Sequence, residues 1–214
     1  MVGSHALLLF VPAMLAITFA PGPDMLFVLA QSARGGARRG LVAVAGIISG
    51  GTVHIGAAAI GLSALLVRSA LLFSIVKYAG AAYLVYLGLH TLLARERAQP
   101  PAVPADDPSP GPTPSTGSAP FVQGFITNVL NPKVALFVLA FLPQFVDPSR
   151  GHVGAQIAEL GLIWYATAAA LFSAVALAGG AFDRWRRRNP LAQRVERYVT
   201  GTIFVALGAR VALP

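Results

Sequence analysis

Ala20-Pro21-Gly22-Pro23-Asp24 interrupts an apolar run that begins near Ala6 and ends at Arg34. Proline and glycine both disrupt helices, so we expect a helix long enough to cross a bilayer to be broken here. Asp24 precedes Arg34 by ten residues, or about 15 Å at about 1.5 Å per residue. That depth is near the middle of a hydrocarbon core about 30 Å thick. A carboxylate there costs at least about 2.5 kcal/mol, so we expect Asp24 to face a partner or a cavity.

The composition is that of a membrane protein. Of the 214 residues, 56% are hydrophobic and only 11% are charged, and the mean hydropathy is +0.68. Soluble domains carry about 25% charged residues, so a soluble protein with a large core is excluded. The length suits one transmembrane domain of about six spans. The chain has no cysteine, so disulfides and thiolate metal sites are not available.

Six apolar runs predict an all-α integral membrane protein with six transmembrane helices. They cover about residues 6–33, 41–66, 71–93, 121–145, 157–178 and 198–213, the last being short for a span. Residues 98–120 are rich in Pro, Ala, Ser, Gly and Thr and lack apolar periodicity, which predicts a disordered linker. A basic loop is expected from Asp183 to Arg197. The linker separates two three-helix halves, residues 1–97 and 121–214.

Basic residues gather in alternate connections between the runs. The connections after the first, third and fifth runs contain Arg34, Arg38, Arg39, Arg95, Arg97, Arg184, Arg186, Arg187, Arg188, Arg194 and Arg197. The other connections contain only Arg68 and Arg150. The positive-inside rule therefore places the basic loops and the linker in the cytoplasm and both termini outside. The net charge of +8 follows this distribution and forms no basic face interleaved with aromatic residues, so a nucleic-acid partner is not expected.

The N-terminus predicts a retained first span. Its first five residues, Met1 to His5, include no lysine or arginine, and a signal peptide has a basic n-region and a shorter apolar region.

The two halves share a short sequence next to each break. Pro23-Asp24-Met25 is followed by LFVLA at 26–30, and Pro132-Lys133-Val134-Ala135 is followed by LFVLA at 136–140. Each break lies in the first span of its half, and the halves start on opposite sides of the membrane. This is an inverted-topology repeat, the plan of many secondary transporters. The alternative is a chance similarity between two lipid-facing helices.

Asn131-Pro132-Lys133 marks the second break. Lys133 lies 13 residues after Pro120 and 14 before Asp147, which also places it near mid-depth. We expect Asp24 and Lys133 to face one central cavity, paired directly or bridged by substrate and water. A zwitterionic ligand suits such a cavity: its carboxylate can meet a half-helix N-terminus or Lys133, and its ammonium can meet carbonyls or Asp24. The alternative is a buried ion pair that only fixes the register of the halves.

His54 lies in the second run near Gly50 and Gly51. It is a candidate proton relay, and a hydrogen bond to a neighbouring helix is the alternative. Gly46 and Gly50 form a GxxxG spacing, which predicts close helix packing.

No enzyme signature is present in the sequence. There is no Ser-His-Asp spacing, no HExxH and no glycine-rich phosphate loop, and the scattered histidines form no metal cluster. No cofactor is expected. Two alternative functions stay open: export of a metal cation or a toxic organic solute, and a membrane protein that does not transport. A homodimer is a possible oligomeric state.

The chain resembles the lysine exporter/homoserine–threonine exporter (LysE/RhtB) family of bacterial amino-acid efflux proteins. The resemblance rests on PGPD at 21–24, the glycine-rich second run, KYAGAAYLVYLG at 77–88, the segment from Phe121 to Lys133, and Gly201 with Gly208. It implies an inner-membrane exporter of amino acids or their derivatives, driven by the proton motive force. It also implies functional roles for Asp24 and Lys133 and for the residues that flank them, namely Pro21, Gly22, Pro23, Asn131 and Pro132.

Overall fold

The computed structural model describes residues 2–20, 22–68, 70–93, 118–178 and 189–212. All regular structure in these ranges is helical, in agreement with the predicted all-α class. The α-helices are α1 (Ser4–Phe19), α2 (Pro23–Arg68), α3 (Ala70–Leu93), α4 (Ala119–Val129), α5 (Pro132–Phe141), α6 (Val153–Ala178) and α8 (Pro190–Ala212). Two short 3₁₀ helices, η1 (Leu142–Phe145) and η2 (Pro148–Arg150), follow α5. The linker prediction for 98–120 falls almost entirely outside the described residues.

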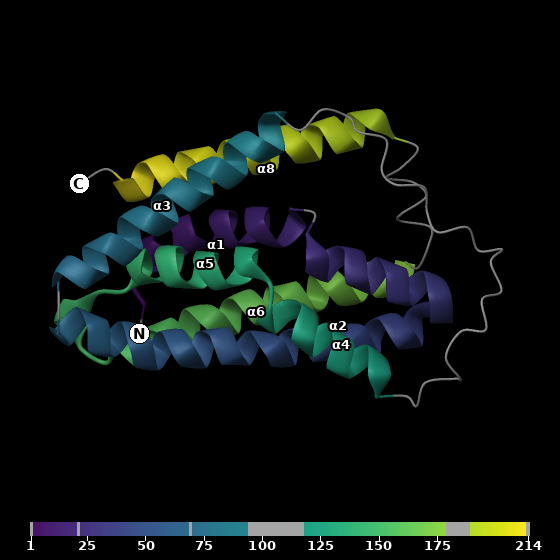
Figure 1. Cartoon of the computed structure of the whole chain (residues 1–214), viewed down its shortest axis with the longest axis horizontal. Helices are drawn as coiled ribbons and strands as arrows, with labels where there is room; N and C mark the ends of the chain where they lie inside the picture. The colour runs from purple at the N-terminus through teal and green to yellow at the C-terminus, as the bar shows by residue number, and fades with distance from the viewer. Residues whose placement is uncertain (1, 21, 69, 94–117, 179–188, 213–214) are drawn as a thin grey trace.

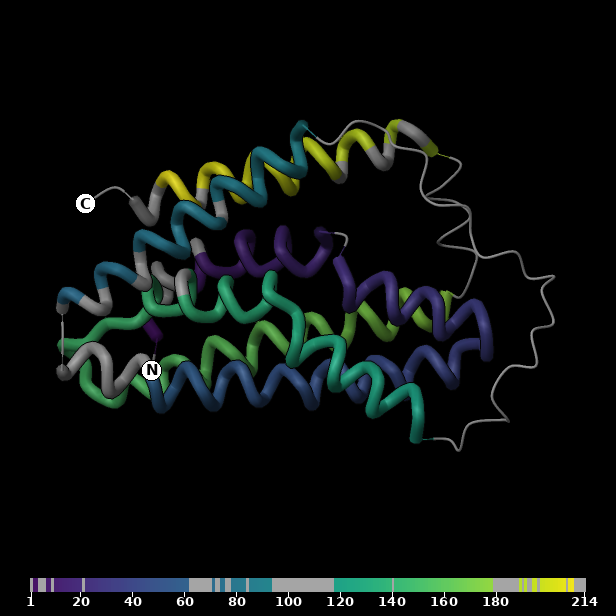
Figure 2. Tube along the Cα trace, viewed as in Figure 1, coloured from purple at the N-terminus to yellow at the C-terminus, as the bar shows by residue number. Residues whose placement is uncertain are grey.

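The helices run mostly along one common axis (Figures 1 and 2). The start of α1 and the end of α8 lie at one end of the bundle, on the left of Figure 1. The Val2 amide donates to Glu159 Oε2 on α6 at 3.0 Å, which fixes the start of the chain at that same end. The connection inside α2 that carries Arg34, Arg38 and Arg39 lies at the opposite end.

Several described helices are membrane-span candidates. Pro23–Gly61 and Val153–Ala178 are long and apolar enough to cross a membrane, and Ala119–Val129 with Pro132–Phe145, bent by 49°, forms a third candidate if the pair is one span. Phe10–Phe19 and Tyr78–Leu93 are shorter apolar helices. The described residues are therefore consistent with a membrane protein, and the six-span arrangement stays a prediction.

The α2 helix consists of two arms joined at Gly35 and Gly36. Gly36 has φ +70°, a left-handed conformation that glycine adopts without steric cost. The first arm runs from Pro23 to this turn, and the second runs back along the bundle to Arg68. The first arm is the continuation of α1 beyond the break, and the second arm corresponds to the second apolar run.

Both helix breaks lie at the proline motifs where the sequence predicts them. α1 ends at Phe19 and α2 begins at Pro23, while α4 ends at Val129 and α5 begins at Pro132. Asn131 caps α5, because its side-chain oxygen accepts the Lys133 amide at 3.1 Å. Proline is favoured in the first turn of a helix, because the N–H group that it lacks would have no partner there. Each motif therefore ends one helix and starts the next.

The predicted basic loop from Asp183 to Arg197 is wrong from Pro190 onward. The α8 helix already begins at Pro190, so Arg194 and Arg197 lie on a helix. Asn189-Pro190 is itself a helix-start signal, with a capping side chain followed by proline. The polar composition of this segment favours a loop, but a helix can continue beyond the apolar part of a span.

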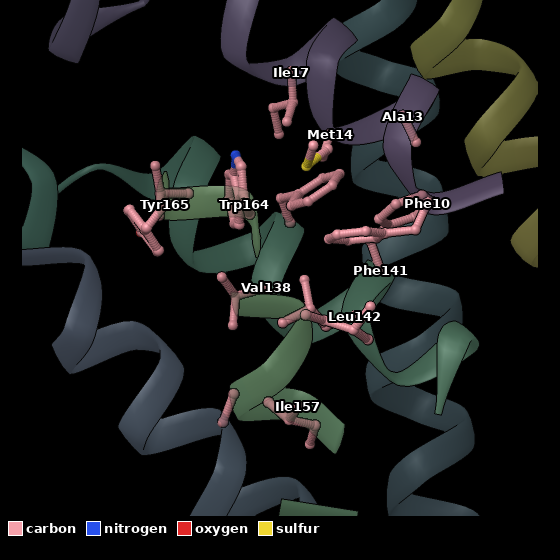
Figure 3. Close-up of a cluster of buried hydrophobic side chains, with 14 of the residues drawn as sticks. Phe10, Ala13, Met14, Ile17, Val138, Phe141, Leu142, Ile157, Trp164 and Tyr165 are labelled. Atoms are coloured by element: carbon pink, nitrogen blue, oxygen red, sulfur yellow. The ribbon is translucent and has the colours of Figure 1, made fainter. Parts of the chain in front are cut away.

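An aromatic cluster joins α1, α5 and α6 (Figure 3). Phe10, Phe137 and Phe141 are fully buried. The Phe137 ring centroid lies 4.5 Å from that of Phe141 and 4.7 Å from that of Trp164. Phe145 adds an edge-on contact to Phe10 at 5.3 Å. These contacts hold α1 and α5, one segment from each broken helix, against α6.

Glycines allow the second arm of α2 to pack closely on α4. A Cβ at Gly46 would overlap the Phe121 carbonyl, and one at Gly50 would lie 2.7 Å from the Phe125 carbonyl oxygen. Gly46 and Gly50 thus form a packing face, because small residues let neighbouring helices approach closely in a membrane.

We expect Gly46→Leu to lower the melting temperature of the purified protein by about 5 °C or more, because overpacking costs about 1–3 kcal/mol. The matched control is Gly56→Leu on the same arm, where an added Cβ meets no atom within 4 Å. Equal melting temperatures for the two variants would contradict the packing role.

Candidate functional site

A cavity lies where the two helix breaks meet. Its polar lining comes from Thr18, Asp24, Asn128, Asn131, Lys133 and Tyr165, and much of its apolar lining from Ile17, Met25, Ile47, Ala168 and Phe172. Its volume is about 30 Å³, room for about two water molecules. Among the described residues, Asp24 and Lys133 are the charged ones that line it.

Asp24 is held by an amide from the other half of the chain. Asn128 Nδ2 on α4 donates to Asp24 Oδ2 on α2 at 2.8 Å. The two side chains are only 7% and 1% exposed. A carboxylate without a proton can only accept, so the amide nitrogen of Asn128 must face it. This contact spans 104 residues of sequence and ties the first break to the second.

Lys133 is tied to the first break through the backbone. Its Nζ donates to the Ala20 carbonyl oxygen at 2.8 Å, at the C-terminal end of α1. The break leaves that carbonyl without a continuing helix, so it is available to accept. Gly22 faces the same ammonium, since a Cβ there would lie 3.2 Å from Nζ. The second break thereby contributes a cation to the unwound part of the first.

His54 connects the second arm of α2 to the end of α4. Its Nε2 lies 3.0 Å from the Asn128 carbonyl oxygen, which can only accept, so Nε2 carries the hydrogen in this bond. His54 does not itself line the cavity, although it lies near enough to interact with the charge of Asp24. The geometry is that of the hydrogen bond to a neighbouring helix, the alternative to a proton relay in the sequence analysis.

The predicted site residues separate into distinct groups. Gly22, Asp24, Asn131 and Lys133 all line the cavity. The prolines that start α2 and α5, Pro23 and Pro132, are exposed and do not line it. Pro21 lies outside the described residues. Asp24 and Lys133 therefore share one cavity, while the functional role of each predicted residue stays a prediction.

Sequence reasoning missed several polar residues of the cavity. Asn128 lies on α4 just before the break, whereas Lys133 lies on α5 just after it. Asn128 is a polar residue within an apolar run, which was the available signal. Trp164 and Tyr165 lie within the fifth run and gave no comparable signal. In the structure, Trp164 Nε1 donates to Thr18 Oγ1 at 2.9 Å, and Thr18 Oγ1 in turn donates to the Met14 carbonyl at 2.6 Å. These bonds anchor α6 to the end of α1 beside the cavity.

Within the described ranges, no group of three or more His, Cys, Asp and Glu side chains is placed to hold a metal ion. The polar groups at the cavity are instead one carboxylate, one ammonium, amides and hydroxyls.

Several known proteins are similar to this chain. A protein from Pseudomonas aeruginosa named uncharacterized membrane protein PA4757 is 34% identical over 95% of this chain and 93% of its own length. The leucine efflux protein of Salmonella typhimurium is 30% identical over 92% of this chain and 89% of its own length. Uncharacterized membrane protein YrhP of Bacillus subtilis is 29% identical over 98% of this chain and 99% of its own length.

No solved structure gives a significant match. The family model described as LysE type translocator matches residues 15–214, which include both helix breaks and the whole cavity. The chain therefore belongs to the LysE type translocator family.

Proposed function

We propose that the protein exports a neutral amino acid across the bacterial inner membrane by alternating access. The observation that carries this proposal is the cavity itself: two broken helices contribute one carboxylate and one ammonium to the same enclosed space. Buried ionisable groups at such a position are costly, and in transporters they mark substrate or ion pathways. An amino acid brings the complementary pair of charges.

The two charges suit opposite ends of a zwitterion. The substrate ammonium would bind at Asp24, and its carboxylate would bind at Lys133 and the half-helix N-terminus beside it. The α5 helix starts next to Lys133, so the positive end of its dipole faces the same region. In the structure Asp24 accepts a hydrogen bond from the neutral Asn128 amide, and Lys133 donates one to the neutral Ala20 carbonyl. Substrate would exchange these partners for full opposite charges.

The rest of the cavity favours an uncharged side chain. Met25, Ile47, Ala168 and Phe172 form an apolar wall. The one acid and the one base that line the cavity are both used by the α-ammonium and the α-carboxylate, so no charged lining residue is left for a cationic or anionic side chain. The relatives named leucine efflux protein agree with this assignment.

An amino acid needs more than the cavity's present volume of about 30 Å³, so transport requires the surrounding helices to move. Toward the basic end, Arg39 Nε donates to Gln31 Oε1 at 2.6 Å, and Gln31 Nε2 donates to Gln123 Oε1 at 3.2 Å. Toward the other end lies the aromatic cluster of Phe10, Phe137, Phe141 and Phe145. Transport would open these two sets of contacts in turn, with the basic end in the cytoplasm and both termini outside.

The inverted repeat is supported by the pattern of packing. Helix α3 packs on α5, α8 packs on α1, and α3 and α8 pack on each other. In a two-fold arrangement of halves, α3 corresponds to α8 and the α4–α5 pair to α1 with the first arm of α2. Each of these two helices then packs on the broken span of the other half, α3 on α5 and α8 on α1, as is expected if the halves are repeats of one unit. Proton coupling would use Asp24, which can release a substrate ammonium by taking up a proton.

The test is an efflux panel in cells with and without the protein. Cells are loaded with labelled leucine, valine, lysine or glutamate, and efflux is followed into medium free of amino acids. We expect the protein to accelerate efflux of the neutral amino acids several-fold more than that of lysine or glutamate, and a protonophore to abolish the acceleration. Efflux that the protein changes for none of the four compounds would overturn the proposal, and preference for lysine would overturn the assignment of a neutral side chain.

A further inference from the structure

Three buried oxygen atoms at the cavity have no hydrogen-bond partner among the described residues. They are Asp24 Oδ1, Asn128 Oδ1 and the Tyr165 hydroxyl. Their residues are 7%, 1% and 7% exposed, and all three line the cavity. Buried polar atoms are satisfied in the great majority of cases, so three in one place call for an explanation.

The orientation of Asn128 determines what these atoms can bind. Because its nitrogen is committed to Asp24 Oδ2, its Oδ1 is left as an acceptor. The main chain of Asn128 is fixed as well, since its carbonyl is bonded to His54. Asp24 Oδ1 is a second acceptor with negative charge. A ligand at this position must therefore be a donor, and a positive charge favours it.

The hydroxyl of Tyr165 completes the group from a third helix. Tyr165 lines the same cavity as Asn128 and Asp24. Its ring stacks on Trp164 with centroids 5.2 Å apart. On its other side it presses against α2 so closely that a Cβ at Gly51 would overlap the ring. The position of the hydroxyl is thus set by packing, although the oxygen itself has no bond in the closed cavity.

We propose that Asp24 Oδ1, Asn128 Oδ1 and the Tyr165 hydroxyl together bind a primary ammonium group, with Asn128 and Tyr165 as binding residues beside Asp24. The inference rests on the proposed function, because it names the part of the amino acid that this side of the cavity recognises. A primary ammonium has three N–H donors, one for each oxygen. A secondary ammonium has two and must place its substituent against the third oxygen. The neutral hydroxyl is the weakest of the three acceptors, so the substituent would lie there.

The test combines one substitution with one change in the substrate. Export of L-leucine and N-methyl-L-leucine is measured for the wild-type protein and for Tyr165→Phe, at concentrations below saturation. We expect the wild-type protein to prefer leucine about tenfold, as for one lost hydrogen bond to a charged group. Tyr165→Phe should slow export of leucine about tenfold and leave export of N-methylleucine nearly unchanged, so that the preference disappears.

Tyr86→Phe is the matched control. Tyr86 lies on α3, is 61% exposed and does not line the cavity, so this variant should keep the wild-type preference. Tyr165→Phe removes a hydroxyl without a partner, so the melting temperature should not fall.

Equal slowing of both substrates by Tyr165→Phe would show a structural role and overturn the proposal, and so would no slowing of either. A wild-type protein that exports neither compound nor any amino acid of the panel would overturn the proposed function itself. A protein that exports leucine while Tyr165→Phe keeps the preference would overturn only the ammonium site.

Discussion

Asp24→Asn is expected to abolish export while leaving a folded protein in the membrane. The amide has nearly the same volume as the carboxylate and still offers an oxygen to Asn128 Nδ2. What it lacks is the negative charge that the substrate ammonium needs. Removing one partner from a buried charge pair costs about 3–5 kcal/mol. We therefore expect the leucine efflux rate, normalised to protein in the membrane, to fall at least about 100-fold.

The matched control for this variant is Asp147→Asn. Asp147 pairs with Arg150 at 3.0 Å in the connection before α6, and both side chains are about half exposed. Hydrogen bonds from Ser149 hold the pKa of Asp147 below its ordinary value, which places this carboxylate in a stable local turn outside the helices. Exposed pairs contribute little, so efflux should be kept. Efflux near the wild-type rate in Asp24→Asn would remove Asp24 from the mechanism.

Lys133→Met is expected to have the second largest effect. Methionine keeps a flexible apolar stem but loses the ammonium that bonds to the Ala20 carbonyl and would bind the substrate carboxylate. We expect leucine efflux to fall at least about 30-fold, because a hydrogen bond between charged groups is lost at a half-buried site. The measurement is again efflux normalised to membrane protein, with the melting temperature recorded for each variant.

The double variant Asp24→Asn with Lys133→Met separates transport from a purely structural role. If the two charges only fix the register of the halves, each single variant should be unstable and the double variant should regain both stability and efflux, because the uncompensated buried charge is gone. If they bind substrate, the double variant should be stable and still inactive. Recovery of efflux in the double variant would therefore refute the assignment of the two charges as substrate-binding groups.

The two breaks could be predicted because proline and glycine act locally. Pro23 and Pro132 start helices regardless of what packs around them. The expected depth of Asp24 and Lys133 follows from helix rise alone and stays a prediction, while the structure places both residues at the same cavity.

The partners of these residues could not be predicted in the same way. The bond from Asn128 to Asp24 and the one from Lys133 to the Ala20 carbonyl join positions more than 100 residues apart. Nothing in the local sequence of Tyr165 shows that its hydroxyl meets them. Such contacts depend on how α4 and α6 pack against α2, and glycines such as Gly50 and Gly51 decide that distance. The start of α8 differs from the prediction for a simpler reason: polar composition favours a loop, whereas Asn189-Pro190 is a helix-start signal.

The hydrogen bonds of the closed cavity also bear on the return half of the cycle. Asp24 Oδ2 accepts a hydrogen bond from Asn128, and Lys133 donates one to the Ala20 carbonyl, so each charged group has a neutral partner within the protein, although Asp24 Oδ1 has none. A carrier whose charged groups have protein partners in the absence of substrate can return to its inward-facing state without carrying a solute back. Such a protein would export its solute without taking up a second solute in exchange.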